Sequence, residues 1–310
     1  MLRQGLLWLS EREGIFDFVR RNGLARKFAS RFVAGETVAE GVAAALELQR
    51  RQVGTTLDLL GESVTRAAEA ESARDDYLDM LARLQAGGLD TNVSVKLTQM
   101  GLDVDQSLCA ANLGRIVRRA AELDGFVRID MESSAYTQRT LDFYFQNITA
   151  DLQPHCGVVI QSSLRRSAAD VALLIERQVR VRLCKGAYLE PHDVAFPDKK
   201  DVDRTYREMM ERLLLEGRYP GIATHDERII DHAREFIERH RIPPDRYEFQ
   251  MLYGVRRDLQ RKLRAAGHRL RVYIPFGSQW YPYLMRRLAE RPANIAFMLG
   301  NVVRESVSRS

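Results

Sequence analysis

Two adjacent arginines near the C-terminus are the residues whose chemistry stands out first. The stretch YLMRRLAERPAN covers residues 283–294, and the spacing i, i+3, i+4 and i+7 is occupied by Tyr283, Arg286, Arg287 and Glu290. That spacing is one face of an α-helix. Taken alone, the arginine pair indicates a solvated face with ion pairs between neighbouring turns. Arginine forks also bind carboxylates through two parallel hydrogen bonds, so the alternative is an anion clamp.

Polar side chains also recur at the ends of short β-type runs along the chain. They are Lys96, Asp130, Gln161, Arg182, Lys185, Thr224, His225 and Tyr273. Each one by itself is typical of a surface group beside a loop. Together with the arginine pair they predict a cationic site, with Asp130 as the main opposing charge, for a ligand that carries a carboxylate, a phosphate or both.

The β-type runs predict eight strands that would bring these groups together. The runs are TTLDLL, NVSVKL, VRIDM, GVVIQ, VRLCK, GIAT, YEFQM and LRVYI, and amphipathic helical patterns separate them. Strands that alternate with helices pair in parallel through right-handed crossovers, and eight such units predict an α/β fold, a closed (βα)8 barrel of the TIM type. The alternative is an open doubly wound sheet, but the GxGxxG turn with which such a sheet binds a dinucleotide is absent from the sequence. In a barrel, reactive groups gather at the carboxyl ends of the strands.

The domain organisation follows from the same pattern. Helical periodicity with glycine breaks precedes the first β-type run. It predicts an N-terminal helical arm over residues 1–53, followed by the barrel over residues 54–310. No linker-like segment or internal repeat divides the chain further.

Composition is that of a soluble globular protein, with 45% hydrophobic and 29% charged residues in a chain of 310. The net charge of +5 is scattered and forms no basic tail, so nucleic acid is not a predicted partner. Cys109, Cys156 and Cys184 lie far apart without CxxC spacing, which favours a reducing compartment without disulfides. The apolar run near the N-terminus is too short for a signal peptide, and no later window is long enough to cross a membrane. These features predict a cytoplasmic location.

Other reaction classes find little support in the motifs. His225 and Asp226 are adjacent, but HExxH is absent and the remaining histidines lack ligand spacing, so no metal site is predicted. GxSxG is absent too, and Cys184 beside Lys185 is typical of a packed strand residue. The turn KGAY, residues 185–188, places small residues after a β-type run, where backbone N–H groups can approach a ligand closely.

Six segments within residues 92–294 resemble, in this order, those of the proline dehydrogenases, which are flavoenzymes with a (βα)8 barrel. They are VSVKLTQMG, VRIDMESS, GVVIQSSLRRS, VRLCKGAY, ATHD and YLMRRLAERPAN. The resemblance implies FAD as cofactor and the oxidation of L-proline to Δ1-pyrroline-5-carboxylate by hydride transfer to the flavin, the first step of proline catabolism to glutamate. Without a second dehydrogenase domain, the chain is similar to the monofunctional bacterial form.

The resemblance also implies partners and a location. Electrons would pass to a membrane quinone, which allows peripheral contact with the inner face of the membrane. Δ1-Pyrroline-5-carboxylate dehydrogenase would be a further partner, since it consumes the product.

Site residues follow from the same resemblance, position by position. The flavin site would comprise Met131, Gln161, Arg182, Lys185, Gly186, Ala187, Thr224 and His225. The substrate site would comprise Lys96, Asp130, Leu252, Tyr273, Tyr283, Arg286 and Arg287, with Glu62 pairing with Arg287 as a gate. Arg182 near the flavin and Asp130 beside the cations would be the catalytic pair. No role is transferred to residues 276–282, because the family members fused to a second enzyme have a longer segment there.

Two other classes of function remain open on the residues alone. One is a barrel lyase or aldolase in which Lys96 or Lys185 forms a Schiff base with a phosphorylated substrate. The other is a carboxylate-binding barrel without catalysis.

Overall fold

Eight parallel strands close into a barrel, which confirms the predicted (βα)8 fold. The structure is a computed structural model and describes residues 29–281 and 283–285. The strands are β1 (Gly54–Leu59), β2 (Asn92–Val95), β3 (Phe126–Ile129), β4 (Cys156–Gln161), β5 (Arg180–Cys184), β6 (Gly221–Ala223), β7 (Glu248–Leu252) and β8 (Leu270–Phe276). They pair in chain order, and β8 pairs back onto β1. Each strand falls on one of the eight predicted runs.

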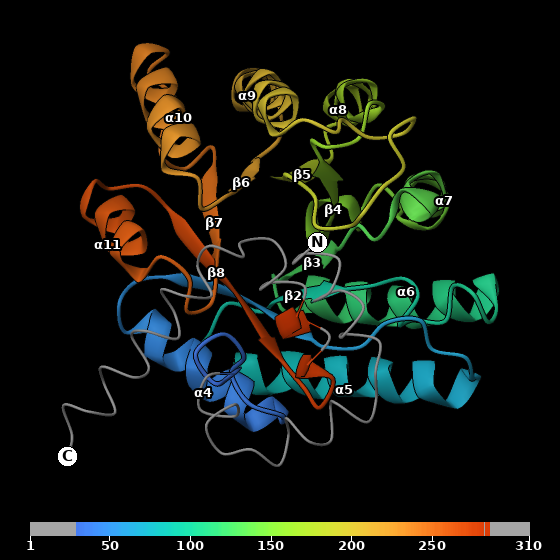
Figure 1. Cartoon of the computed structure of the whole chain (residues 1–310). Coiled ribbons are helices and arrows are strands. Elements are labelled where there is room, and N and C mark those ends of the chain that lie inside the picture. Colours follow the sequence, from blue (N-terminus) through green and yellow to red (C-terminus); the bar gives the residue numbers. More distant parts are fainter. Residues whose placement is uncertain (1–28, 282, 286–310) are drawn as a thin grey trace.

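Helices surround the strands in the order of the chain (Figure 1). They are α5 (Ala67–Ala86), α6 (Gln106–Glu122), α7 (Ser134–Asn147), α8 (Ser167–Glu176), α9 (Lys199–Glu216), α10 (Glu227–Arg239) and α11 (Arg257–Ala265), with a short 3₁₀ helix η1 (Gln153–His155) before β4. Their apolar sides and the outward faces of the strands form one continuous core. None of the described helices is long and apolar enough to cross a bilayer.

The last part of the predicted N-terminal arm belongs to the barrel wall. Helix α4 (Val38–Gln49) begins with a capping box, in which Thr37 and Glu40 each bond the other's backbone or side chain. It packs on β1, β8 and α5 and occupies the position between α11 and α5 (Figure 1). A Cβ at Gly41 would lie 2.9 Å from the Phe276 ring, so the absence of a side chain lets α4 approach β8 closely.

The interior of the barrel is polar, in contrast to the branched apolar side chains that usually fill such barrels. Arg182 of β5 bonds Ser94 of β2 and Gln250 of β7, neither of which is a neighbouring strand. Its side chain therefore crosses the barrel. Nearer the amino end of the barrel, Glu248 of β7 accepts a hydrogen bond from Arg271 of β8. Side chains alternate between the two faces of a strand, and the positions that face inward here are largely charged or amide groups.

Two inward-facing glycines make room for these long side chains. A Cβ at Gly157 on β4 would lie 2.3 Å from the carbonyl oxygen of Arg180 and 2.7 Å from Arg128 Nη1. A Cβ at Gly221 on β6 would lie 2.5 Å from Gln250 Nε2. The small residues of β4 and β6 thus match the large residues of the other strands.

The segment after β8 packs against the segment before α4 at the carboxyl end of the barrel. Their common apolar cluster consists of Ala29, Phe32, Val33, Leu60, Trp280, Tyr281, Tyr283, Leu284 and Met285. The backbone of the first segment is held by Ala34 N, which donates to Pro275 O at 2.9 Å, and a Cβ at Gly254 would lie 1.7 Å from Arg31 O. The side chains of Tyr283, Leu284 and Met285 are all buried. Residues 286–294, which carry the arginine pair, lie outside the described residues.

Replacing Gly157 tests whether the interior is filled to capacity. Gly157→Ala should lower the free energy of unfolding by about 1 to 3 kcal/mol, because the new methyl group would collide with the carbonyl oxygen of Arg180, which belongs to the neighbouring strand. The measurement is the midpoint of chemical denaturation. Gly114→Ala on α6 is the control, since its methyl meets only the flexible end of Arg118 and alanine favours a helix by about 1 kcal/mol. Equal effects of the two substitutions would contradict the packing described here.

Candidate active site

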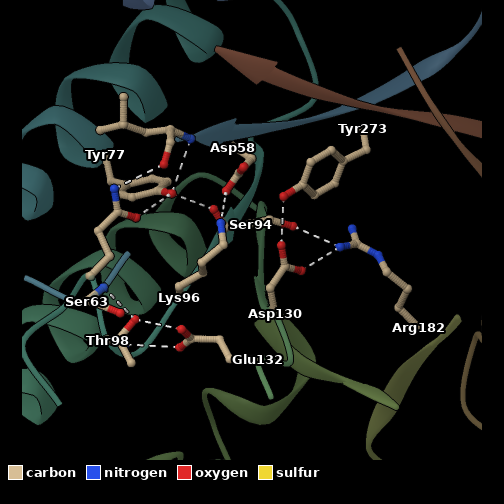
Figure 2. A network of polar contacts seen from close by, with 12 residues as sticks. Asp58, Ser63, Tyr77, Ser94, Lys96, Thr98, Asp130, Glu132, Arg182 and Tyr273 are labelled. Atoms are coloured by element: carbon tan, nitrogen blue, oxygen red, sulfur yellow. Dashed lines mark hydrogen bonds and ion pairs between the residues drawn. The ribbon is translucent and has the colours of Figure 1, made fainter. Parts of the chain in front are cut away.

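A fixed ion pair lies at the carboxyl end of the barrel and involves three of the predicted residues. Arg182 Nη1 donates to Asp130 Oδ1 at 2.7 Å, and the Tyr273 hydroxyl donates to Asp130 Oδ2 at 2.8 Å (Figure 2). The Arg182 guanidinium also lies 5.3 Å from the centre of the Tyr273 ring. Burial and the carboxylates of Asp130 and Asp58 raise the pKa of Tyr273 well above its usual value, so its hydroxyl keeps its proton and remains a donor.

A second ion pair lies beside the first. Lys96 Nζ donates to Asp58 Oδ1 at 3.2 Å, and the Asp58 side chain is 0% exposed. Burial opposes the charge of Lys96, but the carboxylates of Asp58, Asp130 and Glu62 outweigh it and raise its pKa above the usual value. The raised pKa favours the charged form of Lys96. The other oxygen of Asp58, Oδ2, is buried and accepts no hydrogen bond from the described residues.

The polar network continues from these pairs toward α5 and the loop after β3. The Tyr77 hydroxyl of α5 donates to the carbonyl oxygen of Ser94 at 2.7 Å. Thr98 donates through its hydroxyl to Glu132 at 2.7 Å and accepts the backbone N–H of Ser63 at 3.0 Å (Figure 2). The contacts of Thr98 thus connect the segments that follow β1, β2 and β3.

Gly186, in the turn after β5, lies directly against the predicted cofactor residue Gln161 of β4. Gln161 Nε2 donates to the carbonyl oxygen of Glu132 at 2.7 Å, which fixes its amide. Gly186 has a φ of +105°, and a Cβ there would lie 2.4 Å from Ser163 Oγ and 2.9 Å from Gln161 Oε1. Only glycine fits this turn, which brings the backbone of residues 185–187 against Gln161.

The Lys185 ammonium is paired with two carboxylates from later elements of the chain. It donates to Asp203 Oδ1 at 2.6 Å and to Asp226 Oδ2 at 2.7 Å, so it ties the end of β5 to α9 and to the start of α10. Asp226 caps α10 by accepting the N–H of Arg228, and its own N–H donates to Thr224 Oγ1. The charge of Lys185 is therefore held by these two carboxylates, and only the backbone of Lys185 contributes to the turn at 186–187.

The remaining predicted residues lie around the same mouth. His225 Nε2 accepts the backbone N–H of Leu252 at 2.9 Å, so the neutral ring carries its proton on Nδ1. Met131 and Tyr283 are buried, while Glu62, Ala187 and Leu252 are half-buried. Arg286, Arg287 and Glu290 lie outside the described residues, and so does the predicted contact of Glu62 with Arg287. In the described part of the chain, no three His, Cys, Asp or Glu side chains converge as a metal site.

Sequence reasoning missed the interior residues that hold the predicted ones in place. These are Asp58, which binds Lys96, and Ser94, Glu248 and Gln250, which support Arg182 directly or through one another. A signal was present, because polar residues alternate along most of the predicted strands, as in TTLDLL, NVSVKL and YEFQM. In a barrel that pattern indicates a polar interior and not a solvated face.

Comparison with known proteins identifies close similarity over nearly the whole chain. Residues 42–299 match the sequence model of the family described as proline dehydrogenase. The chain is 40% identical over 308 residues to the proline dehydrogenase of Deinococcus radiodurans, with 98% of each chain covered. It is 37% identical over 305 residues to proline dehydrogenase 1 of Bacillus subtilis strain 168, covering 98% of this chain and 100% of that one.

A solved structure is similar as well. It is the crystal structure of proline utilization A (PutA) from Bdellovibrio bacteriovorus inactivated by N-propargylglycine, with a TM-score of 0.81 and 26% identity. The match covers 90% of this chain but 34% of that longer one. The barrel therefore corresponds to about a third of the PutA chain.

The Lys185–Asp226 contact makes a prediction for stability against pH. Burial opposes ionisation of Asp226, but Lys185 and Lys199 outweigh it and lower the pKa to about 2. A lowered pKa stabilises the fold above the unfolded value of about 3.9, and this contribution disappears as the pH falls toward 2. Asp226→Asn keeps a capping residue and should lower the urea midpoint near neutral pH, with the difference from wild type shrinking below about pH 4.

Asp105→Asn is the matched control for this substitution. Asp105 caps α6 by accepting the N–H of Leu108 at 2.7 Å, and within the described residues it has no lysine or arginine partner. Its replacement should leave the urea midpoint nearly unchanged. A difference for Asp226→Asn that persists unchanged at low pH would exclude the ion pair as its cause.

Proposed function

Since the chain belongs to the proline dehydrogenase family and is therefore an oxidoreductase of proline catabolism, we propose that it uses FAD to oxidise L-proline to Δ1-pyrroline-5-carboxylate and passes the electrons to a quinone. The observation that carries the proposal is the Asp130–Arg182 ion pair at the barrel mouth. It holds a buried guanidinium cation where the resemblance assigns the flavin. A fixed cation stabilises negative charge that develops nearby.

The flavin would be held by residues from the ends of β3 to β6. They are Met131, Gln161, Arg182, Lys185, Gly186, Ala187, Thr224 and His225. Their chemistry supports this assignment, because the Gly186 turn admits no side chain, His225 carries a proton on Nδ1 and Arg182 supplies a positive charge. When bound, the flavin supplies the redox chemistry by accepting a hydride. The contribution of Lys185 would come from its backbone, since its ammonium is paired with two carboxylates.

Proline would lie between this layer and the arginine pair. Lys96, kept charged by Asp58, is suited to attract the substrate carboxylate, and Arg286 and Arg287 would complete the clamp from outside the described residues. Tyr273, Tyr283 and Leu252 would border the ring, while Asp130 fixes Arg182 and Tyr273 relative to each other. Orienting the reacting carbon over the flavin is most of what the protein must supply. The Glu62–Arg287 gate would close over the bound substrate.

The Schiff-base alternative is disfavoured by the lysines themselves. An amine that forms a Schiff base must be available in its neutral form, usually through a lowered pKa. The pKa of Lys96 is instead raised by the carboxylates around it, and Lys185 lies between Asp203 and Asp226. Both ammonium groups are thus held in ion pairs with carboxylates.

The proposed partners follow from the reaction. A membrane quinone would take the electrons, which requires only peripheral contact at the inner face of the membrane. Δ1-Pyrroline-5-carboxylate dehydrogenase would take the product.

Proline-dependent bleaching of bound flavin tests the proposal directly. The purified protein, after incubation with FAD, should show the visible absorbance of oxidised flavin and lose it when L-proline is added without oxygen. A quinone analogue should restore the absorbance. Protein that binds no flavin would contradict the cofactor, while bound flavin that proline leaves oxidised would contradict the reaction.

A further inference from the structure

We infer that Gln250 is a positioning residue for the reaction: its amide fixes the Arg182 guanidinium at the barrel mouth and thereby sets how strongly the reduced flavin is stabilised. The inference rests on the proposed function, since it assigns Arg182 to the flavin. It goes further by locating the support of Arg182 in a chain of hydrogen bonds that descends through the barrel.

This series of hydrogen bonds begins at Arg182, at the carboxyl end of the barrel, and ends at Arg271, near the amino end. Gln250 Oε1 accepts a hydrogen bond from Arg182 Nε, and Gln250 Nε2 donates to Glu248 Oε1 at 2.6 Å. The single N–H of Arg271 Nε is shared between the two carboxylate oxygens of Glu248, at 2.9 and 3.1 Å. Arg271 Nη1 is anchored on the carbonyl oxygen of Thr55 at 2.7 Å and on Asp90 at 3.0 Å. Residues of β5, β7, β8 and β1 thus form one connected unit.

The chemistry of its neighbours explains why an amide occupies position 250. Arg182 only donates, because a guanidinium has no acceptor. Burial opposes the charge of Glu248, but Arg271 outweighs it and lowers its pKa, so Glu248 is ionised and only accepts. A residue between them must accept on one side and donate on the other, and an amide does both without titrating.

The same contact limits how Arg182 can move. Nη1 is bound to Asp130 and Ser94, and Nε is bound to Gln250, so both edges of the guanidinium are fixed. Without the Nε contact the group could turn about its Asp130 bond, and a cation that must reorganise stabilises developing charge less well than a fixed one. Gly221 supports the arrangement from β6, because any side chain there would displace the Gln250 amide.

Replacing Gln250 by methionine removes both the acceptor for Arg182 and the donor to Glu248 while keeping the length of the side chain. In FAD-loaded Gln250→Met, kcat should fall about tenfold to a hundredfold, as expected for a lost hydrogen bond to a charged group, with KM for proline changed less than about threefold. The flavin midpoint potential should become more negative by about 30 mV or more, the equivalent of a tenfold weaker preference for the reduced form in a two-electron couple. FAD should remain bound.

Asn112→Leu is the matched control. Asn112 is also buried, accepts from Arg74 Nη1 at 3.1 Å and donates to Met100 O at 3.1 Å. Like Gln250, it therefore accepts from an arginine and donates to an oxygen, but it does so outside the barrel. This control should lose stability but keep the wild-type flavin potential. A potential that moves as much in Asn112→Leu as in Gln250→Met would reduce the role of Gln250 to general stability and overturn the inference.

Gly221→Ala keeps Gln250 but displaces its amide, and it carries the test if Gln250→Met does not fold. Its flavin potential should shift in the same direction. In the double variant the shift should not exceed that of Gln250→Met alone, because both substitutions act through one contact. Additive shifts, or unchanged potential and kcat in both single variants, would overturn the inference. Wild-type protein that proline does not reduce would instead overturn the proposed function, and the inference with it.

Discussion

The structure depends on how the barrel accommodates two buried guanidinium groups, those of Arg128 and Arg182, and two half-buried ones, those of Arg180 and Arg271. Arg128, Arg180, Arg182 and Arg271 occupy its interior and floor, and an arginine cannot escape burial by losing its proton. Arg182 and Arg271 are paired with Asp130 and Glu248. The other two are held differently, since Arg128 donates to backbone carbonyl oxygens and Arg180 lies 3.9 Å from the Phe126 ring centre and 4.6 Å from that of Tyr219. Gly157 and Gly221 supply the space.

The same constraint gives the mouth of the barrel its chemical properties. Because the interior is already hydrogen-bonded from the floor upward, the groups at the top have little freedom. Arg182 is fixed from two sides, Tyr273 stays protonated beside Asp130, and Lys96 stays charged beside Asp58. Such preorganised charges suit a site that must orient a small anionic substrate against a cofactor. Lys185 has a different task and ties the barrel to α9 and α10.

The sequence predicted the strands well but their supporting contacts poorly. Runs such as NVSVKL and GVVIQ are strongly β-type, and groups at the ends of parallel strands must meet at one edge, so Asp130, Arg182 and Tyr273 could be brought together without coordinates. Gln250 could not be assigned, because its role depends on which strands lie opposite each other across the barrel. The direction of Lys185 was equally hidden, since Asp203 and Asp226 lie on later elements. Helix α4 was expected as part of an arm, and only packing could reveal that it completes the wall.

The central claim is that Asp130 and the barrel interior act on the reaction through a single fixed Arg182. The most direct measurement is the rate at which proline reduces bound flavin in Asp130→Asn, in Arg182→Met and in the double variant. Each single substitution should slow the reduction by more than about tenfold. The rate of the double variant should lie within about threefold of the rate of the slower single variant. Rate losses that multiply in the double variant would show that the two residues act independently, which would contradict the account.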